Sequence, residues 1–64
     1  MNPITQLLIE NESQAEKIKA AAIRGAAEAG FKINFYGNDV KFDEAGYNDQ
    51  DAATAAALAE IKQI

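Results

Sequence analysis

Apolar residues recur with helical spacing over the first 30 positions of the chain. At 100° per residue, the small and apolar residues that fall within about 60° of one line are Ile4, Leu7, Leu8, Ala15, Ile18, Ala22, Gly25, Ala26 and Ala29. Asn2 and Pro3 form a typical helix start, because Asn caps free N–H groups and Pro gives up a donor that would be unpaired there. Gly30 is a typical helix stop, since glycine readily takes the left-handed conformation. The pattern predicts a helix over residues 3–29.

Polar residues in the first third of this stripe leave a second interpretation open. Asn11 is a polar residue that lies on the apolar stripe. Ser13 and Glu16 fit the capping-box pattern that begins a new helix. The segment is therefore either one continuous helix, which we favour, or two helices broken near residues 11–13.

After residue 30, the apolar residues no longer recur with helical spacing but occupy every second position. Apolar residues alternate with polar ones over residues 31–35 and again over 40–42, which is typical of strands with one buried face. Taking Gly37-Asn38 as the two-residue turn of a hairpin sets the register. On the apolar face, the opposing pairs are then Phe35 and Val40, Ile33 and Phe42, and Phe31 and Glu44. On the polar face, they are Tyr36 and Asp39, Asn34 and Lys41, and Lys32 and Asp43.

The last segment predicts a second helix over about residues 49–63. Asn48 or Asp49 can cap it, and residues 52–59 are almost all Ala, the best helix former. With the hairpin over about residues 31–43, the chain reads as one α+β domain spanning residues 1–64, in the order long helix, two-stranded antiparallel hairpin, Ala-rich helix (αββα).

The length of the first helix predicts self-association. A helix over residues 3–29 would extend ~40 Å, whereas a compact domain of 64 residues is roughly 28 Å across. The helix would project beyond the hairpin and the second helix, and the apolar residues at its exposed end would need another surface. We therefore expect a homodimer formed through Ile4, Leu7, Leu8 and Ile9.

The composition argues against catalysis and against a cofactor. The chain has no His and no Cys, and so lacks the commonest general base, the thiol nucleophile and the usual transition-metal ligands. Ser13, the only Ser, has no candidate base, and no phosphate-binding glycine motif occurs. Asp49 and Asp51 form a D-x-D pair, but the Gly and Glu of a calcium-binding loop do not follow. We expect no enzyme activity, no cofactor and no metal.

Acidic residues are concentrated in the middle of the chain. The net charge of −4 opposes binding to nucleic acid or to anionic membranes. No signal segment or membrane span is apparent, and the lack of Cys suits a reducing compartment, so a cytoplasmic location is expected. We predict a contact surface for a basic protein partner, which comprises Tyr36, Asp39, Asp43, Glu44, Tyr47, Asp49 and Asp51.

These features favour a small acidic protein-binding module, a regulator or inhibitor of the kind that phages and mobile elements encode. The element order resembles, in topology alone, the small head-completion proteins of tailed phages, whose basic character this acidic chain lacks. The resemblance transfers no residue role. The alternative function is a structural subunit of a larger assembly, such as a phage particle component, in which the first helix packs against copies of itself or neighbouring subunits.

Overall fold

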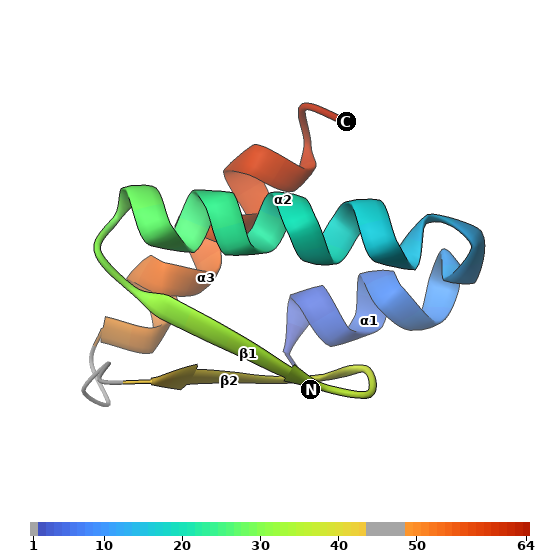
Figure 1. The fold of residues 1–64 in the computed structure, drawn as a ribbon, viewed down its shortest axis with the longest axis horizontal. Helices are drawn as coiled ribbons and strands as arrows, with labels where there is room; N and C mark the ends of the chain where they lie inside the picture. The colour runs from blue at the N-terminus through green and yellow to red at the C-terminus, as the bar shows by residue number, and fades with distance from the viewer. Residues whose placement is uncertain (1, 44–48) are drawn as a thin grey trace.

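Three helices and a β-hairpin form two layers in the computed structural model, which describes residues 2–43 and 49–64. Figure 1 shows the helices above and the hairpin below. The elements in chain order are α1 (Pro3–Glu10), the 3-10 turn η1 (Glu12–Gln14), α2 (Ala15–Glu28), β1 (Lys32–Tyr36), β2 (Asp39–Asp43) and α3 (Gln50–Ile61). The α+β class and the order of helix, antiparallel hairpin and helix are as predicted. No helix in the described residues is long and apolar enough to cross a membrane.

The first helical segment is broken, so the prediction of one continuous helix over 3–29 is wrong and the alternative is confirmed. Asn2 caps α1 as expected, with its Oδ1 accepting from the Ile4 N–H at 2.8 Å. Asn11 ends α1, where both its backbone N–H and its side-chain Nδ2 donate to the Leu7 carbonyl. The expected capping hydrogen bond from the Ser13 side chain does not form. The structure shows no side-chain cap at the start of η1 or of α2.

The break turns α1 back along the first half of α2 (Figure 1). The molecule measures 31 × 21 × 14 Å, so no ~40 Å rod projects from it. Ile4 and Leu8 are 0% and 1% exposed within the chain's own core. The overhang that motivated self-association is therefore absent, and that argument no longer assigns these two residues to a contact between copies.

The end of α2 follows the local signal in the sequence. Ala29 is the C-cap and Gly30 has φ 88°. The Gly30 N–H donates to the Ala27 carbonyl at 3.0 Å and the Phe31 N–H to the Ala26 carbonyl at 2.8 Å, the pair of bonds that defines a Schellman motif. This motif satisfies two of the last carbonyls of α2 and directs the chain into β1.

The hairpin has the predicted register at every described pair. Ile33 lies opposite Phe42, Phe35 opposite Val40, and Tyr36 opposite Asp39, and the remaining two polar pairs also match. Gly37 takes a φ of 64° in the turn, as the tight two-residue hairpin turns require. The predicted partner of Phe31, Glu44, lies outside the described residues.

Close contact between α2 and α3 forms the centre of the core. Most of the buried residues on these helices are small, with Ala21, Ala22, Ala26, Ala53 and Ala57 all at 0% exposure. At Gly25 the backbones approach so closely that an added Cβ would lie 2.4 Å from the Ala56 carbonyl oxygen and 2.9 Å from the Ala57 Cα. Ile33 and Phe42 join the same core from the hairpin side.

We expect Gly25→Ala to destabilise the fold by about 1–3 kcal/mol, the usual cost of overpacking a core. Helix propensity alone predicts the opposite, since Ala is favoured over Gly by about 1 kcal/mol inside a helix. The sign of the change in urea unfolding free energy therefore separates the two effects. A more stable Gly25→Ala protein would contradict the close approach of α2 and α3.

A matched pair in α1 tests whether this helix folds back. Leu8→Ala should cost about 2–4 kcal/mol, because it opens a cavity in the core. Ile9→Ala, one residue later at 44% exposure, should change the unfolding free energy by less than about 1 kcal/mol. Equal effects of the two substitutions in chemical denaturation would show that α1 does not pack as described.

Candidate functional site

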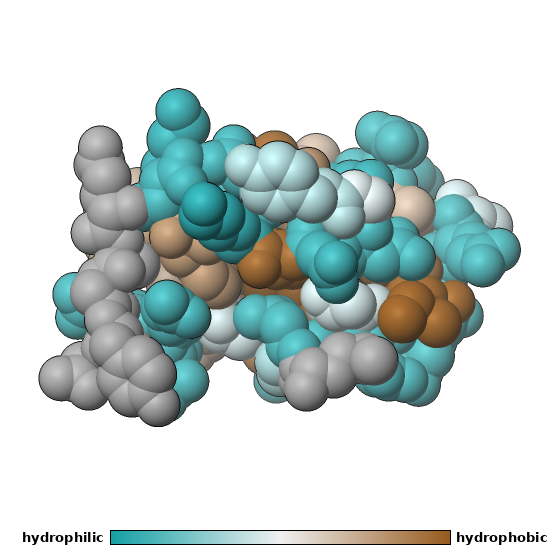
Figure 2. Space-filling view, turned by 90° about the horizontal axis from the view of Figure 1, so that it is seen from below, coloured by the Kyte–Doolittle hydropathy of each residue, from teal (hydrophilic) through white to brown (hydrophobic). Residues whose placement is uncertain are grey.

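The hairpin presents a polar face away from the helices. We define the outer face of the hairpin as Lys32, Asn34, Tyr36, Asp39, Lys41 and Asp43. Alternation along both strands directs these side chains outward because Ile33 and Phe42, between them, are buried against the helices. Figure 2 shows the hairpin side from below, mostly polar, with apolar surface emerging near the middle and toward one end.

The charges on this outer face balance. The face carries two lysines and two aspartates. Lys32 lies opposite Asp43, Lys41 opposite Asn34, and Asp39 opposite Tyr36. The Asn34 Nδ2 also donates to the Asp43 Oδ2 diagonally across the ladder. Asp43 is therefore engaged within the hairpin, and the face as a whole carries no net charge.

Tyr36 is the most exposed large apolar side chain of the described residues. It is 61% exposed at the turn end of the hairpin, opposite Asp39. A Tyr ring combines a large apolar surface with a polar tip, and such residues contribute strongly when an interface covers them. The structure thus leaves this ring available for a contact outside the chain.

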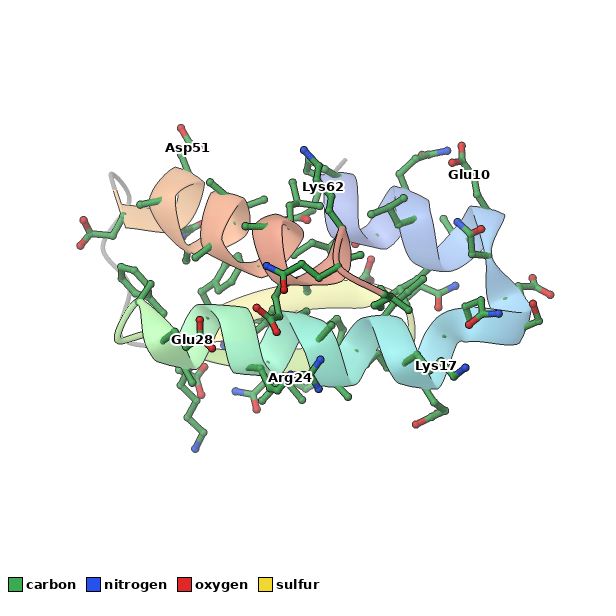
Figure 3. All side chains as sticks on the ribbon, turned by 90° about the horizontal axis from the view of Figure 1, so that it is seen from above. Glu10, Lys17, Arg24, Glu28, Asp51 and Lys62 are labelled. Atoms are coloured by element: carbon green, nitrogen blue, oxygen red, sulfur yellow. The ribbon has the colours of Figure 1, made fainter. Side chains whose placement is uncertain are left out.

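Of the predicted contact residues that the structure describes, Tyr36, Asp39 and Asp43 share the outer face of the hairpin, and Asp49 and Asp51 lie at the start of α3. Asp39 and Asp43 lie at opposite ends of β2, roughly 13 Å apart at 3.3 Å per residue. Asp49 and Asp51 are exposed at the start of α3, and Asp51 points outward from that helix in Figure 3. Asp39 lies directly opposite Tyr36, while Glu44 and Tyr47 lie outside the described residues.

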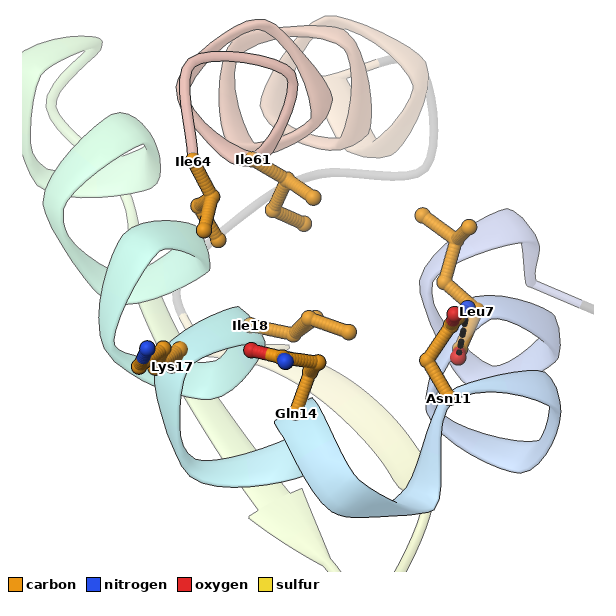
Figure 4. Close-up of a pocket in the computed structure, with 7 residues that line it drawn as sticks. All are labelled: Leu7, Asn11, Gln14, Lys17, Ile18, Ile61 and Ile64. Atoms are coloured by element: carbon orange, nitrogen blue, oxygen red, sulfur yellow. Dashed lines mark hydrogen bonds between the residues drawn. The ribbon is translucent and has the colours of Figure 1, made fainter.

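A groove that the sequence did not reveal lies between α1, the start of α2 and the end of α3. Its volume is about 480 Å³, and its lining consists of Leu7, Asn11, Gln14, Lys17, Ile18, Ile61 and Ile64. Figure 4 shows the apolar side chains around the central space and the polar ones along its edge. Lys17 is the only charged residue in the lining.

The groove exists because α3 and α1 both pack on α2 but leave a gap between them. Ile18 of α2 forms the floor, Leu7 one wall, and Ile61 with Ile64 the other. Leu7 was predicted to contact a second copy, and it is half-buried at this wall. The other lining residues were missed, because their proximity depends on the break at Asn11.

Metal-ligating clusters and unpartnered buried polar atoms are the usual marks of a further site. Among the described residues, no cluster of three or more His, Cys, Asp or Glu side chains is placed to hold a metal. Within the same residues, no buried side-chain nitrogen or oxygen is left without a hydrogen-bond partner. Comparisons with protein-family models, curated proteins and solved structures found no match to this chain.

Proposed function

We propose that this chain is a small, acidic, non-catalytic protein-binding module that contacts its partner through the outer face of the hairpin. The observation that carries the proposal is the 61% exposure of Tyr36. A domain of only 64 residues has little apolar surface to bury, yet it leaves this ring in water. A contact with another protein would bury the ring and gain the corresponding stabilisation.

The hairpin also supplies the rigidity that an anchor residue needs. Both strands pack on the helices through Ile33 and Phe42, and Lys19 lies over the Phe35 ring at 5.8 Å, which adds a cation–π contact between α2 and β1. Tyr36 therefore projects from a fixed backbone, so binding orders few additional torsions.

Charges around Tyr36 give the contact its specificity. Asp39 lies directly opposite Tyr36, and a basic group of the partner would pair with it while the ring is covered. The surrounding Lys and Asp residues form a polar rim of both signs, which restricts the orientation of a partner more than it adds affinity.

The module would regulate or inhibit a larger protein by covering part of its surface. The chain's lack of His and Cys supports a role without chemistry, since the commonest general base and thiol nucleophile are missing. Genes for small regulators of this kind occur in phages and mobile elements, and the proposed place of action is the cytoplasm, which suits a chain without Cys.

A second candidate function is a structural subunit of a larger assembly. It is favoured by the exposure of three isoleucines, Ile9, Ile23 and Ile64, at 44%, 48% and 59%. In an assembly these residues would lie between neighbouring subunits, and the mass in solution would exceed that of a dimer.

A photo-crosslinking side chain at position 36 tests the main proposal. In a lysate of the cells that express this chain, it should trap a protein partner, whereas the same group at position 23, on the exposed side of α2, should not. With the partner purified, Tyr36→Ser should weaken binding by about 2 kcal/mol, roughly 30-fold in Kd. Tyr36→Phe should retain most of the affinity.

Ile23→Ser is the matched control for the loss of exposed apolar surface, and its affinity should equal that of the unchanged protein. A partner that binds Tyr36→Ser as tightly as the unchanged protein would refute the hairpin as the contact surface. Crosslinks from position 36 to further copies of this chain alone would favour the assembly function.

A further inference from the structure

The connection between α1 and α2 consists of residues that a helix also accepts. It comprises Asn11, Glu12, Ser13 and Gln14, with no Gly and no Pro among them. Glu12–Gln14 already form a 3-10 turn, whose backbone angles are close to those of an α-helix. The larger departures are at Asn11, with φ −131° and ψ 57°, and at Gln14, with φ −107° and ψ 6°. Rotations at two residues therefore separate the broken helix from a continuous one.

The break leaves backbone groups without helical partners. The first N–H groups of a helix have no acceptor within it, and no side chain caps η1 or α2. A continuous helix would bond these groups to the carbonyls four residues earlier. In the single chain this gain is outweighed by the burial of Ile4 and Leu8, which a straight helix would expose.

The buried residues of α1 and α2 fall on one side when the two helices are joined. At helical spacing, Ile4 and Leu8 share a stripe with Ile18 and Ala22, and all four belong to one core. The buried sides of α1 and α2 would thus point the same way in a continuous helix. A second continuous helix, antiparallel on that side, would place its own α1 against the α2 that the first α1 had left.

We propose that two copies of this chain exchange α1. In the dimer, residues 3–28 of each copy form one continuous helix, and the two helices lie antiparallel about a twofold axis near residues 11–14. The α1 of each copy occupies the site on the other copy that its own α1 fills in the single chain. Each copy keeps the burial of Ile4 and Leu8 and also gains the helical hydrogen bonds that the break removes.

The structure shows which segment fits the exchanged site, because α1 fills it in the single chain (Figure 1). The fit is close, since Ile4 and Leu8 are 0% and 1% exposed there and Thr5 is 6% exposed. A second copy carries the same three residues at the same spacing. Exchange of an identical element is a low-cost route to a dimer, and a short connection between the exchanged element and the rest of the chain favours it.

The proposal rests on the connection at residues 11–14 and not on the role proposed for Tyr36. The outer face of the hairpin takes no part in the exchange. Failure of the dimer would therefore leave the Tyr36 contact standing, and failure of that contact would leave the dimer standing.

Refolding at high concentration tests the exchange. The full chain is unfolded in urea, refolded at about 1 mM and separated by size-exclusion chromatography with light scattering, which should show a dimer beside the monomer. Asn11→Ala should lower the dimer Kd about tenfold, because Ala favours the helix at both connections of the dimer. The substitution also removes the Asn11 side-chain hydrogen bond to the Leu7 carbonyl at the break.

Two substitutions of Glu12 provide a matched pair. Pro is accepted at the first position of a helical turn, which Glu12 holds in η1, but it breaks a continuous helix in its interior. Glu12→Pro should therefore remain a folded monomer up to about 1 mM, whereas Glu12→Ala, with the same loss of charge, should dimerise at least as well as the unchanged chain. Urea unfolding checks that both variants are folded.

A distance within one chain distinguishes exchange from contact between two surfaces. Gln6 and Ile23 are exposed, and the chain has no Cys, so Gln6→Cys with Ile23→Cys accepts two spin labels. The doubly labelled chain is refolded with an excess of unlabelled chain and measured by dipolar electron paramagnetic resonance. The two positions should be ~26 Å apart along the continuous helix of the dimer, but only about 10–15 Å apart in the monomer, where the helices lie side by side.

Three outcomes would overturn the proposal. The first is a purely monomeric mass for both the unchanged chain and Asn11→Ala after refolding at about 1 mM. The second is a dimer whose distance between positions 6 and 23 equals that of the monomer, which would indicate contact between intact surfaces such as the groove. The third is equal dimerisation of Glu12→Pro and Glu12→Ala.

Discussion

The close approach of α2 and α3 at Gly25 is the constraint on which the other elements depend. A chain of this size has little apolar material, and much of it is Ala, so burial can be achieved only if the helix backbones come nearly into contact. Gly25 permits this approach, because any side chain there would collide with the backbone at Ala56 and Ala57. The larger residues of α1 and the hairpin then complete the core around this pair.

The break at Asn11 follows from the same shortage of core. A continuous first helix would leave its initial turns without a covering surface, whereas folding back buries Ile4 and Leu8 almost completely. The break interrupts the helical hydrogen-bond ladder, and Asn11 compensates in part by donating twice to the Leu7 carbonyl. Burial of two large aliphatic side chains, worth roughly 1.5–3 kcal/mol each, outweighs that interruption.

The two candidate surfaces arise from different features of the architecture. The outer face of the hairpin exists because a two-stranded sheet covers the helices with one side only, so its polar side and Tyr36 remain in solvent. The groove exists because α1 and α3 share α2 without meeting along their full lengths. The outer face lies on the hairpin, and the groove lies among the helices.

Several elements could be predicted from the sequence because their signals are local. Helical spacing and Gly30 predicted the end of α2. The alternation of apolar and polar residues predicted the hairpin register, because it places polar pairs on one face and apolar pairs on the other. The exposed position of Tyr36 follows from that register, because neighbouring residues in a strand face opposite sides.

Other features depend on contacts between residues far apart in the sequence and could not be predicted from it. Local signals at Asn11 and Ser13 allowed both a continuous and a broken helix, and the burial of Ile4 and Leu8 selected the break. The groove combines Leu7, Ile18 and Ile61 from separate helices, so no local pattern marks it.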